Sequence, residues 1–78
     1  MTKISATKLD VARARLIIAV GHDVEWRQFA DWASLSPHTI AGIRNGRSAG
    51  STKTVRSIIE MLRDRGVNIL TDDLLESV

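Results

Sequence analysis

Residues 29–46 of the chain read FADWASLSPHTIAGIRNG and carry its strongest structural signals. Apolar residues at helical spacing in the first half predict a short helix over residues 24–34. In the second half, Ser36 is a good N-cap, and Pro37 suits a first helical turn because its missing N–H costs nothing there. A second short helix is therefore expected over residues 37–45, with a tight turn between the two.

Amphipathic segments flank this pair of helices on both sides. Residues 6–20 carry apolar side chains three and four positions apart, which predicts a helix. Gly21 follows and suits the left-handed residue that commonly ends a helix. A further helix is expected to begin at a cap formed by Ser51 or Thr52, to carry its apolar residues on one side, and to end at Gly66.

The segment after Gly66 fits more than one structure. Residues 67–70 alternate loosely and include two β-branched side chains, which suits a short strand. Residues 71–73 can cap a last helical turn that extends through Leu75. The predicted fold class is therefore all-α, with four or five helices and room for a short C-terminal strand.

Composition limits the size and class of the protein. The 78 residues suffice for a single domain with one core, and the 44% hydrophobic and 26% charged residues are typical of a folded globular chain. Cysteine is absent, so no disulfide forms, and two histidines do not supply the usual tetrahedral zinc site. Because the longest apolar run, residues 16–20, is far too short to cross a bilayer, a cytoplasmic protein is expected.

Charge is distributed unevenly along the chain. Residues 32–59 contain no acid but four basic side chains, whereas residues 57–78 contain five acids and two arginines. A basic stretch is more often a solvated face than a nucleic-acid footprint, so it needs a structural partner before it indicates binding. The predicted helix pair lies at this basic stretch.

Residues 29–46 resemble the helix-turn-helix of Cro/cI-type, XRE-like bacterial and phage repressors. The positions that match are the small residue where the helices cross, the buried turn residue, the two apolar anchors and the helix-ending pair, which are Ala30, Leu35, Ile40, Ile43 and Asn45-Gly46. Ser34 departs from the pattern because the family favours glycine there. With the flanking helices, the resemblance covers residues 6–66 and implies a lambda-repressor-like domain that binds double-stranded DNA.

The resemblance implies that the exposed face of the helix over residues 37–45 meets base edges in the major groove. The candidates for base reading are Pro37, His38, Thr39, Ala41 and Gly42. Among them, His38 and Thr39 can hydrogen-bond to a base, whereas Ala41 and Gly42 let the helix approach closely.

Donor side chains around this helix are candidates for phosphate contacts. They are Trp26, Arg27, Ser36, Arg44, Asn45, Arg47, Ser48 and Lys53. Arg27 and Lys53 each lie in the first turn of a predicted helix, where exposed backbone N–H groups favour an anion. Packing beside Phe29 is preferred for Trp26 over donation of its indole N–H to a phosphate. Trp32 covers the last long helix or lies in a partner interface.

A homodimer on an inverted repeat is expected because one recognition helix reads few base pairs. The candidate dimerisation segment is the tail over residues 67–78, which is unusually apolar. Its interface residues would be Val67, Ile69, Leu70, Leu74 and Leu75, with Val78 at the end of the chain.

The expected function is transcription regulation by a small repressor, and the resemblance implies a phage, plasmid or other mobile element as its source. Without an effector domain, the bound protein would block RNA polymerase, or recruit it from a neighbouring site. The alternative is a helix-turn-helix protein that binds and antagonises another regulator. The acid-free stretch and the small, polar exposed face favour DNA over that alternative.

Catalysis is not expected from this sequence. The chain has no cysteine or tyrosine, and no cofactor or metal is implied. Residues 46–54 superficially resemble a phosphate-binding loop, but the glycine and lysine spacings of that motif are absent.

Overall fold

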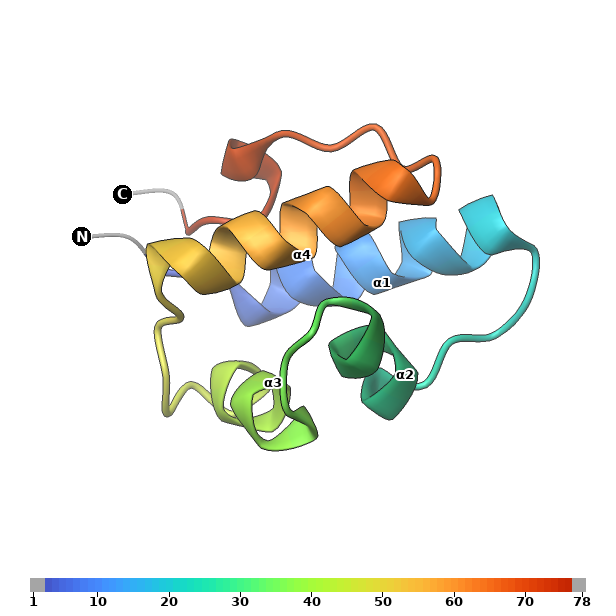
Figure 1. The fold of residues 1–78 in the computed structure, drawn as a ribbon. Coiled ribbons are helices and arrows are strands. Elements are labelled where there is room, and N and C mark those ends of the chain that lie inside the picture. The colour runs from blue at the N-terminus through green and yellow to red at the C-terminus, as the bar shows by residue number, and fades with distance from the viewer. Residues whose placement is uncertain (1–2, 77–78) are drawn as a thin grey trace.

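The computed structural model describes residues 3–76, which contain four α-helices and one short 3-10 helix (Figure 1). The elements are α1 (Ala6–Val20), α2 (Trp26–Trp32), α3 (Pro37–Arg44), α4 (Thr52–Asp64) and the 3-10 helix η1 (Thr71–Asp73). In the view of Figure 1, α2 and α3 lie below α1 and α4. The predicted all-α fold with four helices is confirmed.

Local capping explains the bounds of α1. The Ser5 hydroxyl accepts a hydrogen bond from the Lys8 amide at 3.2 Å, which satisfies one of the free amides of the first turn. At the other end, Gly21 adopts a φ of +80° and its amide donates to the Ile17 carbonyl at 2.9 Å. Both ends of this helix agree with the sequence prediction.

The second helix is shorter than the range expected from the sequence. It begins at Trp26 and ends at Trp32, whereas the apolar spacing predicted residues 24–34. Val24 is fully buried but precedes the helix. Its apolar side chain fits the helical spacing, but burial of a side chain does not require that its backbone is helical. The third helix follows the prediction closely, with Asn45 as its C-cap.

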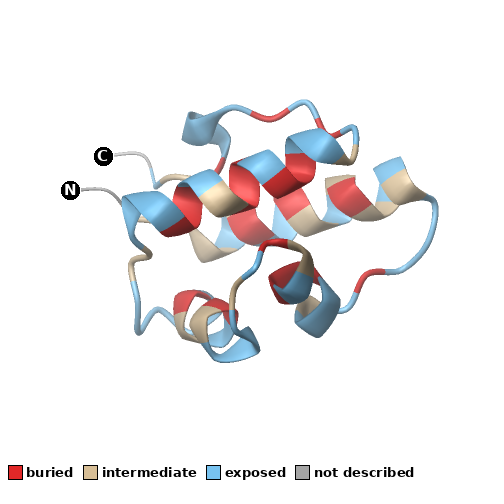
Figure 2. Ribbon diagram, in the orientation of Figure 1, coloured by how far each residue is buried: buried red, intermediate tan, exposed pale blue. Residues whose placement is uncertain are grey.

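One hydrophobic core joins all four helices (Figure 2). The buried faces of the helices supply most of it, including Leu9, Phe29, Ile40 and Ile58, each at most 1% exposed. Burying such side chains stabilises the fold by roughly 1.5–3 kcal/mol each. Within residues 3–76, no helix combines the length and the apolar character needed to cross a bilayer.

The tail after α4 belongs to this core, which therefore extends beyond residues 6–66, the span of the family resemblance. Val67, Ile69 and Leu74 are 4%, 1% and 0% exposed, and Ile4 at the other end of the chain is 1% exposed. A small domain exposes much apolar surface unless its terminal segments cover the helices. The tail performs this role over α4.

The tail is not the short strand that the sequence allowed over residues 67–70. In the described residues its one β-type contact is an isolated antiparallel bridge between Ile4 and Leu75. The Ser5 amide donates to the Leu74 carbonyl at 2.8 Å, and Lys8 Nζ donates to the Leu75 carbonyl at 2.6 Å. Residues 74 and 75 of the tail therefore pair with the N-terminal segment, while residues 67–70 form no strand. The predicted last helical turn is present as η1.

Burial also contradicts most of the predicted dimer interface. Val67, Ile69 and Leu74 pack inside their own chain, so a second copy cannot reach them without unfolding the tail. Leu75 is half-buried against the same core, and Leu70 is 63% exposed. Val78 lies outside the described residues.

Candidate nucleic-acid interface

The turn between α2 and α3 is closed by backbone hydrogen bonds. The Leu35 amide donates to the Ala30 carbonyl at 2.8 Å, and the Ala33 amide donates to the Phe29 carbonyl at 3.1 Å. Ser34 adopts a φ of +59°, the one positive φ of a non-glycine residue in the described chain. This left-handed backbone explains why glycine is favourable at such a position.

The first turn of α3 uses its hydroxyl groups locally. Ser36 Oγ accepts a hydrogen bond from the Thr39 amide at 3.1 Å, and lies 2.9 Å from Thr39 Oγ1. The predicted N-cap is therefore confirmed. Because one of these hydroxyls donates to the other, only one of the two keeps its O–H free for a phosphate or a base in this conformation.

The exposed face of α3 is small and polar. Ile40 and Ile43 point into the core at 1% exposure each. Of the five predicted base-reading residues, Pro37, His38 and Ala41 are exposed, while Thr39 and Gly42 are half-buried. His38 is the exposed member with a hydrogen-bonding side chain, and its imidazole forms no hydrogen bond within the described residues.

The loop after α3 folds back onto that helix. The Gly42 carbonyl accepts from the Arg47 amide at 2.8 Å and from the Ser48 amide at 3.1 Å. These bonds hold Arg47 and Ser48 beside the end of α3, while both side chains are exposed. The Ser48 hydroxyl also accepts from the Gly50 amide at 3.3 Å. Gly42 thus faces the loop rather than open solvent.

Trp26 lies in a cluster of aromatic and cationic side chains. Its ring packs edge-on against Phe29 at 5.2 Å between centroids, which confirms the preferred packing interpretation. The guanidinium carbons of Arg44 and Arg13 lie 4.4 and 5.2 Å from the centroid of the same indole. Arg44 thereby contacts α2, although it belongs to the end of α3.

Several cations of this surface lack a carboxylate partner. The two ion pairs of the described residues join Lys3 to Glu76 and Arg13 to Asp23. The unpaired cations around α3 are Arg27, Arg44, Arg47 and Lys53, all of which are exposed. Asn45, the C-cap of α3, is exposed as well.

Two of the predicted phosphate contacts are less closely tied to α3. Lys53 lies in the first turn of α4. The N-cap of that helix is Ser51, whose Oγ accepts a hydrogen bond from the Thr54 amide at 3.1 Å. Arg27 projects from α2, which has seven residues. Within residues 3–76, neither side chain forms a hydrogen bond to α3.

Trp32 covers the end of α4, which is one of the two roles expected for it. The Arg65 guanidinium carbon lies 4.2 Å from the centroid of its ring, and His22 approaches edge-on at 6.4 Å between centroids. Its ring is packed against the core. Trp32 is therefore engaged within its own chain.

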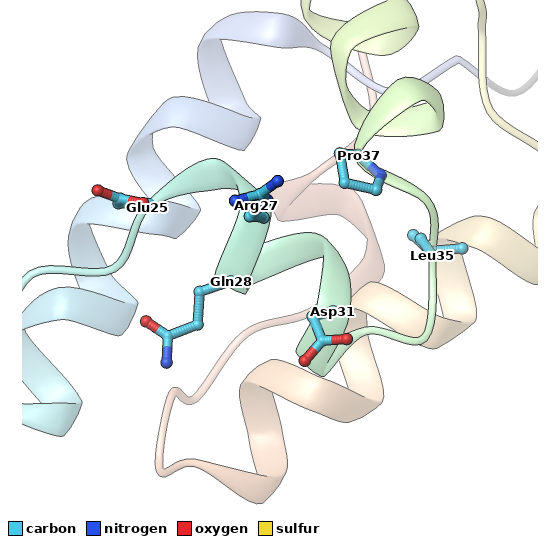
Figure 3. Close-up of a pocket in the computed structure, with 6 residues that line it drawn as sticks. All are labelled: Glu25, Arg27, Gln28, Asp31, Leu35 and Pro37. Atoms are coloured by element: carbon cyan, nitrogen blue, oxygen red, sulfur yellow. The ribbon is translucent and has the colours of Figure 1, made fainter.

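An open hollow of about 540 Å³ lies between α2 and the start of α3 (Figure 3). It is lined by Glu25, Arg27, Gln28, Asp31, Leu35 and Pro37. Glu25, Gln28 and Asp31 were not predicted to be site residues, although their three-residue spacing places them on one side of α2 and its N-cap. Among residues 3–76, no group of three acidic or histidine side chains is arranged to hold a metal ion.

Comparison with protein-family models, curated proteins and solved structures finds no match for this chain. Its function must therefore be inferred from the surface around α3.

Proposed function

We propose that the protein is a sequence-specific DNA-binding transcription regulator of the Cro/cI type, with α3 as its recognition helix. The observation that carries this proposal is the surface around α3, where Arg44, Arg47 and Lys53 have no carboxylate partner in the described residues. Exposed cations without internal partners suit the phosphates of a duplex, which release counterions when such cations bind.

The shape of α3 supports insertion into the major groove. Pro37 and Ala41 are small exposed residues, so they keep little bulk between the helix and the base edges. His38 is the exposed residue that can donate to, or accept from, a purine edge, and one good base contact contributes about 1–3 kcal/mol of discrimination. Arg47 and Ser48, attached to the end of α3 by their amides, would fix the helix against the phosphates.

Regulation would follow from occupancy of the operator. Bound protein would repress by blocking RNA polymerase, and a homodimer would read an inverted repeat with half-sites about 34 Å apart. Since Val67, Ile69 and Leu74 of the tail are buried, the large apolar side chains that residues 3–76 offer to a second copy are Val11, Ile18 and Leu70. Sedimentation velocity of wild type beside Ile18→Glu and Leu70→Glu tests this, and a dimer unaffected by either change excludes both positions.

The proposal is tested by selecting duplexes from a random-sequence library and measuring their affinity by fluorescence anisotropy. At about 0.15 M salt, a specific binder prefers its selected site over a scrambled duplex by about 10³-fold or more. Enrichment of an inverted repeat is also expected. Equal affinity for selected and scrambled duplexes would contradict sequence-specific regulation.

The hollow between α2 and α3 favours a second candidate, an antagonist that binds another regulator. Its lining includes two carboxylates, of Glu25 and Asp31, beside the half-buried Leu35, and this suits a basic protein segment better than a phosphate. Pull-down with wild type and with Asp31→Lys tests it. A partner captured by wild type alone, together with no DNA preference, would replace the first proposal.

A further inference from the structure

Trp26 brings together side chains from three helices. Its indole belongs to the start of α2, while Arg13 comes from α1 and Arg44 from the last position of α3. The two guanidinium carbons lie 5.2 and 4.4 Å from the ring centroid. At such distances a cation is attracted by the ring quadrupole.

The two arginines differ in how their charge is compensated. Arg13 Nη2 lies 3.4 Å from the Asp23 carboxylate, and its Nε donates to the Val24 carbonyl at 2.6 Å. Arg44 forms neither an ion pair nor a side-chain hydrogen bond within the described residues. The Arg13 guanidinium thus has partners within the protein, whereas the N–H groups of the Arg44 guanidinium remain available to a ligand.

The ring that holds Arg44 is itself fixed by the core. Trp26 is half-buried and packs edge-on against Phe29, which is 0% exposed. A stacked guanidinium keeps its N–H groups in its own plane, so stacking leaves them available to an oxyanion. The Arg44 side chain also loses conformational freedom on packing against the ring, before any DNA binds. The entropy cost of ordering it therefore does not reduce the affinity for DNA.

We propose that Trp26 is a positioning residue that holds the Arg44 guanidinium ready for a DNA phosphate at the end of α3. In this role the indole face acts through Arg44, and the indole N–H makes no phosphate contact of its own. The inference rests on the proposed DNA binding, but the contact between Trp26 and Arg44 can be tested without DNA.

The chain offers a matched control for this arrangement. Trp32 is also half-buried and also carries a guanidinium over its ring, that of Arg65 at 4.2 Å. Arg65 follows α4 at its C-terminal end, which lies away from α3 (Figure 1). Loss of Trp32 therefore removes the same kind of contact without removing a contact to Arg44.

The first experiment measures Trp26 fluorescence in a Trp32→Phe background, without DNA. Arg44→Ala should change the intensity or the emission maximum, because the cation leaves the ring face. Arg47→Ala should leave the emission unchanged. An emission that does not respond to Arg44→Ala would overturn the proposal, whatever the protein binds.

The second experiment is a double-mutant cycle on a mixed-sequence duplex at low salt, where phosphate contacts dominate affinity. Trp26→Leu should weaken binding by about three- to tenfold, the cost of immobilising one long side chain. In an Arg44→Ala background the same change should have no further effect. Trp26→Phe, which keeps a ring face without the indole N–H, should bind within about twofold of wild type, as should Trp32→Leu.

Three results would overturn the inference. Trp26→Phe could bind as weakly as Trp26→Leu, which would make the indole N–H the phosphate donor. The effect of Trp26→Leu could persist in the Arg44→Ala background, or Trp32→Leu could weaken binding equally. Circular dichroism and urea unfolding of each variant separate these results from misfolding, and Trp26→Phe preserves a test where Trp26→Leu unfolds.

Failure of this inference is distinguishable from failure of the proposed function. If Arg47→Ala weakens duplex binding while Arg44→Ala and Trp26→Leu do not, the DNA-binding proposal stands and the positioning role is wrong. If none of these variants changes the affinity for any duplex, both are wrong.

Discussion

Gly50 lies directly against Ile4: a Cβ added at Gly50 would come within 2.6 Å of Ile4 Cδ1 and 3.1 Å of its Cγ1. Ile4 is 1% exposed, and its amide donates to the Ala49 carbonyl at 2.9 Å. Gly50 also has a φ of +79°. The loop between α3 and α4 is thus packed on the N-terminal segment, and this contact connects that loop to the core.

Gly50→Ala should lower the free energy of unfolding by about 2–4 kcal/mol, since it adds a steric conflict in the core to a left-handed backbone. Gly21→Ala is the control, because Gly21 has a φ of +80° with nothing within 4 Å of the added Cβ. The control should lose about 1–2 kcal/mol. If urea unfolding gives the same loss of free energy for Gly50→Ala and Gly21→Ala, the contact of the added Cβ with Ile4 does not destabilise the protein.

Ser34→Gly should stabilise the protein. The Ser34 φ of +59° is unfavourable for a residue with a side chain. Relief of that strain exceeds the extra backbone entropy of glycine and should contribute about 0.5–1 kcal/mol. Thermal unfolding measures the change, and Ser34→Val should shift the midpoint downward. A lower midpoint for Ser34→Gly would contradict the expected strain at this turn.

Leu74→Ala should cost about 2–5 kcal/mol, because it leaves a cavity in the core. Leu74 is 0% exposed, whereas Leu70 in the same tail is 63% exposed. Leu70→Ala should therefore remain within about 0.5 kcal/mol of wild type. Urea unfolding compares the two, and similar losses would mean that the tail does not pack as described.

Arg47→Ala and His38→Ala should affect DNA binding in different ways. Removal of one phosphate contact weakens binding to every sequence and reduces the slope of log affinity against log salt by about 0.9. Loss of a base contact instead changes which base is preferred at one position. Anisotropy titrations against duplexes with single substitutions measure both. An unchanged base preference for His38→Ala would contradict its role as a reader.

Ser36→Asp should separate capping from DNA binding. Aspartate caps a helix as well as serine does, so stability should stay within about 0.5 kcal/mol, whereas Ser36→Ala should lose about 1 kcal/mol. If α3 binds DNA as proposed, the new negative charge at its N-cap should weaken duplex binding by about tenfold at low salt. Undiminished binding by Ser36→Asp would place the start of α3 away from the phosphates.

Local signals predicted the helices well because a cap depends on atoms only a few residues apart. Ser36 and Pro37 set the start of α3, and Gly21 ended α1 where the sequence indicated. Ser34 was identified as an unusual residue for its turn, and its positive φ agrees. The candidate recognition face was predictable for the same reason, since helical periodicity separates Ile40 and Ile43 from the exposed residues.

The tail could not be resolved by the same means. Apolar residues such as Val67, Ile69 and Leu74 look alike in a strand, in a dimer interface and in a segment that covers a core. Which of these forms depends on the surface of the neighbouring helix α4 and on the N-terminal segment, which is distant in sequence. Likewise, the pairing of the Ser36 and Thr39 hydroxyls involves side-chain rotamers that composition does not specify.

The amino-acid sequence alone thus determined where the helices lie and which of their faces are buried. Caps and apolar spacing act over only one or two helical turns, so they can be recognised locally. The pairing of the tail with the N-terminal segment and the meeting of Arg13, Trp26 and Arg44 arise from the packing of segments far apart in the chain. Such contacts are selected by the free energy of the whole core rather than by any one segment.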